Sequence, residues 1–398
     1  MEPIMELREQ VERVLQKAVA EGQVAGGSLL VEKDGKELVY AQAGMADKEK
    51  GRAVSRDTVF RLYSQTKPVT AAAVMILLER GELDLFQTVG EFLPAYRKLR
   101  VERRDGSISP AGRPLTLYNL LSMTSGLTYP DESTAAGRAS GALFGEAGSR
   151  LGTDREMTTG ELADRLAEGP LAFEPGTYWQ YGASADVLGA VIEKVSGKTL
   201  AEFMEEEIFR PLGMKDTAFW VPEEKQSRLA KVYETVTGPE ERQDTVEYKG
   251  CHLAVNNAMN RVPAYMAGGA GLASTLDDYM RFARMLLNGG VFEGKRLLKP
   301  KTVEYMTGGR LTEEQQKGFD NWLGLSGYSY GNLMRVCKNP AQAGMLTGLG
   351  EYGWDGWLGT YFANFPRENM TILMGVQKKD GGTFSLTRKL RNLVLSSV

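Results

Sequence analysis

Apolar residues follow a strand-like spacing near both ends of the chain and a helical spacing in its middle. Residues Pro3–Glu21 are amphipathic, which predicts a helix. Asp34-Gly35 separates two β-prone runs, and both residues tolerate the positive φ of a type I′ turn, which predicts a hairpin. Near the C-terminus the pattern predicts strands over Trp357–Phe365 and Met370–Gln377, followed by a helix over Thr383–Leu395.

Helix start signals recur through the middle of the chain. A Ser or Thr that precedes a run of apolar residues at helical spacing can accept a hydrogen bond from a free amide of the first turn. Such signals occur at Thr158 with Glu161, at Thr199 before a run that Pro211 ends, and at Ser274–Asp277. The middle of the chain is therefore predicted to be mostly helical.

The order of these elements predicts an α+β fold. The two chain ends are expected to form one antiparallel sheet flanked by helices, with a helical lobe inserted between them. The expected division is a sheet domain of residues 1–80 and 290–398, and a lobe of residues 81–289. Two long stretches without a clear pattern, Tyr129–Arg155 and Val236–Val262, are predicted to be loops that shape a pocket.

The composition is that of an ordinary globular protein. The chain of 398 residues contains 48 Lys and Arg and 51 Asp and Glu, which gives a formal net charge of −3. The densest basic stretch, Arg97–Arg104, is interrupted by an acidic residue and is interpreted as a solvated loop. No basic excess supports binding of nucleic acid or of an anionic membrane.

Localisation is expected to be cytoplasmic. Cys251 and Cys337 are too few for a disulfide framework, and free thiols suit a reducing compartment. The first twenty residues carry charges throughout, unlike a signal peptide, and the longest apolar run, Ala71–Leu78, is too short to span a bilayer. The expected partner is a small molecule, and the sequence leaves the oligomeric state open.

The familiar hydrolase motif does not fit its surroundings in this chain. Gly327–Gly331 matches G-x-S-x-G around Ser329, but that mechanism needs a His downstream of the serine. The only histidine, His252, lies upstream and is interpreted as structural or exposed. No zinc-ligand cluster, Walker A motif or dinucleotide-binding glycine pattern is present, so no metal or cofactor is expected.

A different arrangement can activate a serine without histidine. Ser64-Gln-Thr-Lys67 is the only S-x-x-K in the chain, and spacing of three on a helix places both side chains on one face. A lysine that is partly desolvated can accept the serine proton. Pro68 fits only the first turn of a helix, which places Ser64 at a helix N-terminus, where free amides favour an oxyanion. By spacing alone, a capped helix with an exposed lysine remains an alternative.

Further motifs lie in Phe60–Thr70, Leu78–Leu85, Leu120–Leu127, Phe173–Ala183 with Asp186–Gly189, Pro211–Thr217 and Gly268–Thr275. These segments resemble the class C β-lactamase-like serine hydrolases, and most of all the family VIII carboxylesterases. The resemblance spans nearly the whole chain in the right order, with Met123 replacing the usual histidine of the third segment. It implies a β-lactamase/transpeptidase-like fold.

The resemblance also implies roles for further residues. Tyr181 would be the tyrosine of the Y-x-N motif and would titrate as one coupled set with Ser64 and Lys67. The K-T-G motif falls on Trp354-Asp355-Gly356, where family VIII esterases commonly have W-G-G. The amide of Trp357 would then join that of Ser64 in the oxyanion hole, and Gly356 would let the strand approach the substrate.

Departures from the β-lactamase pattern favour neutral substrates. Trp354 replaces the lysine that helps to hold an antibiotic's carboxylate, and Ala183 replaces the asparagine of Y-x-N. Asp355 is expected to repel anionic substrates. The predicted function is a serine carboxylesterase that works through an acyl-enzyme on Ser64, with small to medium acyl chains or lactones as substrates. The alternatives are a β-lactamase or D-amino-acid peptidase of the same fold, an acyltransferase to a small alcohol, and a non-catalytic binding protein.

Overall fold

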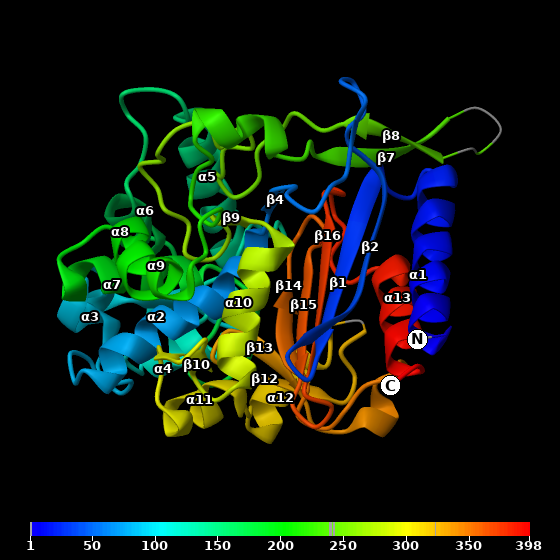
Figure 1. The fold of residues 1–398 in the computed structure, drawn as a ribbon. Coiled ribbons are helices and arrows are strands. Elements are labelled where there is room, and N and C mark those ends of the chain that lie inside the picture. Colours follow the sequence, from blue (N-terminus) through cyan, green and yellow to red (C-terminus); the bar gives the residue numbers. More distant parts are fainter. Residues whose placement is uncertain (1, 239–240, 242, 323) are drawn as a thin grey trace.

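The two ends of the chain form one antiparallel sheet, as the sequence predicts (Figure 1). The computed structural model describes every residue except 1, 239, 240, 242 and 323. In spatial order the strands of this sheet are β12 (Tyr328–Gly331), β13 (Met334–Cys337), β14 (Tyr352–Asp355), β15 (Tyr361–Phe365), β16 (Met370–Val376), β1 (Gly26–Lys33), β2 (Lys36–Asp47) and β3 (Arg52–Ala53).

The register of the central strands joins the first and last thirds of the sequence. Strand β1 pairs antiparallel with β16, where Leu30 lies opposite Leu373. On its other side β1 pairs with β2 through the two-residue turn Asp34-Gly35, whose φ angles are +51° and +77°. Both residues thus adopt the left-handed conformation of a type I′ turn, and the predicted hairpin is confirmed.

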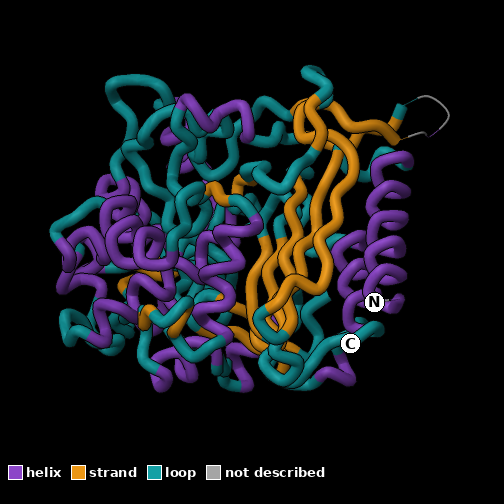
Figure 2. The backbone as a smooth tube through the Cα atoms, in the orientation of Figure 1, coloured by secondary structure: helices purple, strands orange, loops and turns teal. Residues whose placement is uncertain are grey.

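Helices lie against both faces of the sheet (Figure 2). Leu29 and Val31 of β1 pack with α1 (Glu2–Ala20) and α13 (Ser385–Leu395) on one face. Leu30 points the other way, into the larger core shared with the remaining helices. The period of two along each strand therefore separates a back face, under α1 and α13, from a front face toward the helical lobe.

The front face is covered by helices from the middle of the chain. Helix α10 packs against β15 and β16, and α2 packs against α7 and β14. The helices besides α1 and α13 are α2 (Lys67–Glu79), α3 (Val89–Phe92), α4 (Leu117–Leu121), α5 (Ala135–Ser149), α6 (Thr159–Leu166), α7 (Ser184–Ser196), α8 (Leu200–Met204), α9 (Arg210–Leu212), α10 (Leu276–Leu287), α11 (Pro300–Thr307) and α12 (Glu313–Phe319).

Small two-stranded pieces complete the fold. The short strand that precedes the S-x-x-K motif pairs with the short strand that precedes α10. These pieces are β4 (Phe60–Arg61) with β9 (Ala273–Ser274), β5 (Arg100–Glu102) with β6 (Ile108–Pro110), β7 (Tyr233–Thr237) with β8 (Gln243–Glu247), and β10 (Val291–Phe292) with β11 (Lys295–Arg296). The division of the chain into two domains stays a prediction.

Three details of the sequence prediction were wrong. The Trp357–Phe365 strand is shorter, because residues 357–360 form the turn between β14 and β15. The cap of α10 is Thr275, whose side chain accepts from the amide of Asp278. Within the described residues, the stretch 129–155 contains α5, and 236–262 contains β8 and the end of β7.

Helix α5 escaped prediction because its glycines lower helix propensity. Thr134 caps it by accepting from the amide of Gly137, and Leu143 and Phe144 are buried in the core. Tertiary packing outweighs the local preference here. No helix in the described part of the chain is long and apolar enough to cross a membrane.

Candidate active site

Ser64 lies in a single turn of 3-10 helix, Tyr63–Thr66, that leads directly into α2. Pro68 occupies the first turn of α2, as predicted. Tyr63 has a φ of +44°, which a bulky residue rarely adopts. This backbone costs about 1–3 kcal/mol. Surrounding packing therefore has to impose the sharp bend that presents Ser64.

Lys67 is fully buried one turn after Ser64, and its amine faces the serine. Its Nζ donates to Ser64 Oγ at 3.2 Å, to the hydroxyl of Tyr129 at 3.0 Å and to the carbonyl of Gly269 at 2.8 Å. Burial lowers the pKa of Lys67 to about 7, although the charge of Asp186 acts to raise it. At neutral pH a large share of the amine is therefore unprotonated and can accept a proton.

Tyr181 completes the group that the sequence predicts. Its hydroxyl accepts from the indole N–H of Trp354 at 2.9 Å, and its ring centroid lies 4.6 Å from Lys67 Nζ. Burial raises the pKa of Tyr181, while its hydrogen bonds with Ser64 and Trp354 act to lower it. The phenol therefore stays protonated at neutral pH and lies in contact with both Ser64 and Lys67.

Two residues that connect to the Lys67 amine, Tyr129 and Asp186, were missed by the sequence analysis. The Tyr129 hydroxyl accepts from Lys67 and donates to Asp186 Oδ2 at 3.3 Å. Asp186 is buried, and its Oδ1 accepts from the hydroxyl of Tyr265 at 2.6 Å and from the amide of Gly269 at 3.0 Å. The Lys67 amine is thus linked to the Asp186 carboxylate through the phenol of Tyr129. The negative charge of Asp186 favours the protonated amine and so acts to raise the pKa of Lys67.

The sequence held one signal for this pair. Asp186 is the only acidic residue in the first turns of α7, where every residue from Ser184 to Ile192 is buried. A carboxylate in such a surrounding is expected to have a dedicated partner. Tyr129 carried no comparable signal, because it lies in a segment without periodicity, 57 residues away from Asp186 in sequence.

The end of β14 lies directly against the turn that carries Ser64. A Cβ on Gly356 would be 2.3 Å from the carbonyl oxygen of Leu62 and 2.1 Å from Thr360 Oγ1. Thr360 Oγ1 donates to the same carbonyl at 3.1 Å. Only glycine permits this approach, so Gly356 holds the start of the 357–360 turn beside Ser64.

Aromatic side chains surround the ring of Tyr181. The ring centroids of Trp322 and Trp354 lie 5.0 and 5.4 Å from that of Tyr181, and Trp179 stacks with it at 6.4 Å. Trp322, which the sequence analysis did not single out, is 39% exposed, whereas Trp179 and Trp354 are buried. This part of the site is therefore apolar, with one indole at its solvent edge.

Comparison with known proteins assigns the chain to a family. Residues 11–395 match the sequence profile described as Beta-lactamase. The chain belongs to the Beta-lactamase family. Esterase EstB of Burkholderia gladioli is 33% identical over 399 residues, a match that covers 98% of this chain and 95% of EstB. Protein Rv1367c of Mycobacterium tuberculosis is 32% identical over 369 residues, which cover 89% of this chain and 86% of that protein.

Solved structures share the fold. The structure of EstCE1, described as a hydrolase with promiscuous acyltransferase activity, gives a TM-score of 0.78 at 24% sequence identity. The superposition covers 98% of this chain and 99% of EstCE1. The β-lactamase/transpeptidase-like fold implied by the sequence motifs is thereby confirmed.

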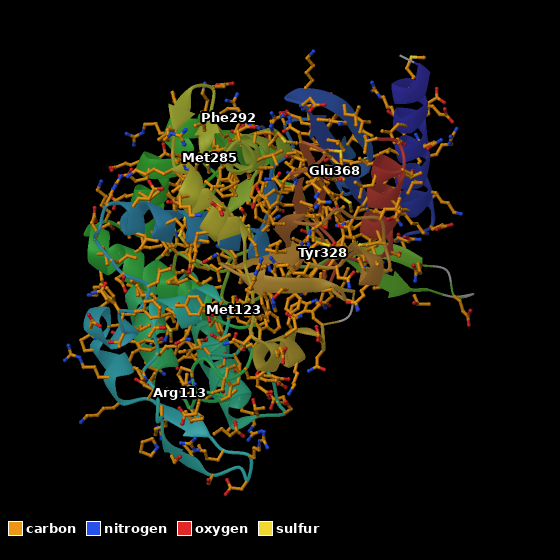
Figure 3. All side chains as sticks on the ribbon, turned by 90° about the horizontal axis from the view of Figure 1, so that it is seen from below. Arg113, Met123, Met285, Phe292, Tyr328 and Glu368 are labelled. Carbon is orange, nitrogen blue, oxygen red and sulfur yellow. The ribbon has the colours of Figure 1, made fainter. Side chains whose placement is uncertain are left out.

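Two departures from the Beta-lactamase family pattern lie in the core. Met123, at the position of the usual histidine and labelled in Figure 3, lies among the other side chains. It is fully buried and has a φ of +56°. Ala183, at the position of the asparagine, is fully buried at the N-terminus of α7. Ala183 therefore offers no polar group to a substrate.

The expectation for Asp355 was wrong. Side chains alternate along β14, so Trp354 faces Tyr181 while Asp355 points away from it. Asp355 accepts from Arg335 Nη1 at 2.8 Å and from the hydroxyl of Thr383. Its charge is thus paired with an arginine on the back face of the sheet and gives no ground for repulsion of anionic substrates.

Ser329 and His252 occupy different kinds of position. Ser329 is buried in β12, where its hydroxyl accepts from the amide of Leu311 at 3.0 Å, so it has a structural partner. His252 lies next to the candidate site, because its ring stacks on that of Trp357. The Beta-lactamase family motif around Ser64, and not the G-x-S-x-G match, thus marks the candidate nucleophile.

Proposed function

We propose that this β-lactamase-fold protein is a serine carboxylesterase of the family VIII type that works through an acyl-enzyme on Ser64. The observation that carries the proposal is the position of Lys67. Its fully buried amine has a pKa lowered to about 7 and lies 3.2 Å from Ser64 Oγ. A neutral amine at this distance is the base that a serine needs in a site without a catalytic histidine.

The reaction runs in two halves. Ser64 Oγ attacks the ester carbonyl and its proton passes to Lys67, while the amides of Ser64 and Trp357 stabilise the oxyanion. The C–O bond to the alcohol then breaks, and the alcohol leaves with a proton relayed through Tyr181. Water attacks the acyl-enzyme next, its proton returns through the same groups, and the carboxylic acid and free Ser64 result.

The hydrogen bonds of Tyr181 support its role as relay. Its hydroxyl is bonded to Ser64 and to the indole N–H of Trp354, and its ring lies against the amine of Lys67. A protonated phenol in this position can give its proton to a departing alkoxide and recover it from the lysine. Lys67 and Tyr181 are in contact, so the amine can act as the base while the phenol acts as the acid.

Ester substrates fit this site better than β-lactams or D-amino-acid peptides. Trp354 presents an indole where the lysine of K-T-G would bind a carboxylate, and Ala183 is buried. Trp179, Trp322 and Trp354 make the Tyr181 side apolar. The 33% identity to a protein named Esterase EstB points the same way.

The proposal is tested with purified protein and p-nitrophenyl butyrate. Wild-type protein is expected to release nitrophenol, and a fluorophosphonate probe is expected to label Ser64. Ser64→Ala should lose both activities and keep its circular dichroism spectrum. Ser64→Ala that retains full turnover would disprove the mechanism. If the protein cleaved nitrocefin faster than the ester, the result would instead favour a β-lactamase.

Acyl transfer is a second candidate function, because the apolar rings around Tyr181 favour an alcohol over water as acceptor. Adding a primary alcohol to the ester assay tests it. A dominant transesterified product at low alcohol concentration would identify an acyltransferase. A protein that neither turns over esters nor reacts with the fluorophosphonate would be a binding module that kept the fold.

A further inference from the structure

A second aromatic group begins at the residue that precedes Ser64. It consists of Tyr63, His252 and Trp357, here named the His252 wall. The rings of His252 and Trp357 stack at 4.1 Å and 17°, and the Tyr63 ring lies 5.0 Å from Trp357 and 5.9 Å from His252. Tyr63 directly precedes Ser64, so the wall begins at the candidate nucleophile.

The backbone around His252 is built to hold the ring there. Leu253 and Ala254, the next two residues, both have positive φ angles, +52° and +55°. The amide of Val255 donates to the His252 carbonyl at 3.1 Å and closes a tight turn. Two consecutive left-handed residues without glycine are strained, and such strain persists where the surroundings impose it. The imidazole is therefore held in place by its turn as well as by the stack on Trp357.

The imidazole has unused hydrogen-bonding capacity. Within the part of the chain that the structure describes, neither of its nitrogens is paired with a protein group. Burial lowers the pKa of His252 to about 4, and the charge of Lys67 lowers it further while Asp380 opposes. The ring is thus neutral at physiological pH, with one N–H donor and one acceptor nitrogen. The Tyr63 ring, 5.9 Å from the imidazole, connects it to the residue that precedes Ser64.

The position of the His252 wall suits contact with the acyl part of a substrate. The departing alcohol takes its proton on the side of Tyr181, within the group formed by Trp179, Trp322 and Trp354. Among the described residues, no aromatic contact joins that group to the His252 wall. Because the alcohol leaves on the Tyr181 side, the His252 wall is the aromatic surface that remains for the acyl chain on Ser64.

We propose that His252 is a specificity-determining residue that hydrogen-bonds a polar substituent of the acyl group. This inference rests on the proposed esterase function and names its substrate class: esters of short acids that carry a hydroxyl or oxo group near the carbonyl. A stacked neutral imidazole supplies both an apolar face for the chain and a donor or acceptor for the substituent. A purely apolar wall would give no such preference.

The test compares two esters that differ by one hydroxyl, p-nitrophenyl 3-hydroxybutyrate and p-nitrophenyl butyrate. The measured quantity is the ratio of their kcat/KM values in wild-type protein and in His252→Phe, which keeps a ring for stacking and removes both nitrogens. Because the variant cannot pair the substrate hydroxyl, the ratio is expected to fall about tenfold. His252→Asn, which restores a donor and an acceptor, should recover part of the ratio.

Tyr248 offers a matched control. Its ring contacts Trp357 at 5.9 Å, but its hydroxyl donates to the carbonyl of Cys251, so Tyr248→Phe should leave the ratio unchanged. An equal loss for both esters in His252→Phe, or an unchanged ratio, would overturn the inference. A different result would overturn the esterase function itself. In that case the wild-type protein would hydrolyse neither ester and would not be labelled by the fluorophosphonate.

Discussion

The two faces of the sheet each bury a cluster of charged side chains, and the clusters are built in opposite ways. On the back face, Glu351 bonds to Arg335 at 3.2 Å and to Arg391 at 2.6 Å, and all three are almost fully buried. Asp355 adds a second acid to Arg335. On the front face, Lys67 is separated from the acid Asp186 by the hydroxyl of Tyr129.

The pKa values of the two clusters show what the difference does. Burial alone would raise the pKa of Glu351, but Arg391 and Arg335 outweigh it and hold the value at about 2. For Lys67, burial outweighs the more distant Asp186 and brings the pKa down to about 7. A buried acid in direct contact with its arginines, such as Glu351, stays ionised at neutral pH. A buried amine separated from its acid by a hydroxyl group, such as Lys67, can gain and lose a proton near neutral pH.

The largest effect is expected from Lys67→Met, which removes the reactive amine and keeps the volume. We expect kcat/KM for p-nitrophenyl butyrate to fall on the order of 10³-fold or more, because no base remains beside Ser64. The melting temperature should stay the same or rise, because a desolvated amine is replaced by an apolar side chain. A fall in melting temperature with activity retained would contradict the comparison.

Glu351→Gln should affect stability instead. It leaves the guanidinium groups of Arg335 and Arg391 without their shared carboxylate, which costs about 3–5 kcal/mol of unfolding free energy. Urea denaturation measures this loss. The kcat/KM of the protein that remains folded should change less than tenfold, because the cluster lies on the opposite face of the sheet from Lys67. A large loss of activity without loss of stability would show that the two faces are coupled.

Tyr129→Phe should have a smaller effect, because it removes only the hydroxyl between Lys67 and Asp186. We expect kcat/KM to fall about tenfold, since the amine loses one hydrogen-bond partner and its fixed orientation. KM should change less than kcat. Tyr96→Phe is a control, because it removes another buried hydroxyl that donates to the carbonyl of Ala163 away from Ser64. An equal loss in both variants would indicate a general packing effect.

The smallest effect concerns pH. If the neutral form of Lys67 is the base, kcat/KM should rise as the pH increases through about 7 and then level off. The charge of Asp186 raises the pKa of Lys67, so Asp186→Asn should lower it and move this rise to lower pH. A profile of kcat/KM against pH measures the midpoint. A shift to higher pH in Asp186→Asn would contradict the assigned coupling.

Local sequence signals predicted much of the fold and the start of the site. Asp34-Gly35 specified its turn through the backbone freedom of two adjacent residues. The spacing of Ser64 and Lys67 placed amine and hydroxyl 3.2 Å apart on one helical turn. Helix α5 was missed, because its glycines argue locally against the helix that Leu143 and Phe144 stabilise by burial.

Residues far apart in sequence could not be brought together in the same way. Tyr129 and Asp186 share a hydrogen bond across 57 residues. His252 lies against Trp357, more than a hundred residues later. Trp322 packs on Tyr181 from the loop after α12. None of these contacts has a periodic or motif signal, because each depends on where whole segments pack.

The sequence by itself determined the secondary structure at both chain ends, the antiparallel sheet and the spacing that pairs Ser64 with Lys67. These features depend on interactions between neighbouring residues and on the period of two or 3.6 in apolar positions. Only the tertiary structure decided that the Lys67 amine is excluded from water and that Asp186 is linked to it through Tyr129. The tertiary structure also decided that the Asp355 side chain lies on the back face of the sheet. Desolvation and charge coupling depend on the atoms that surround a group, and those come from every part of the chain.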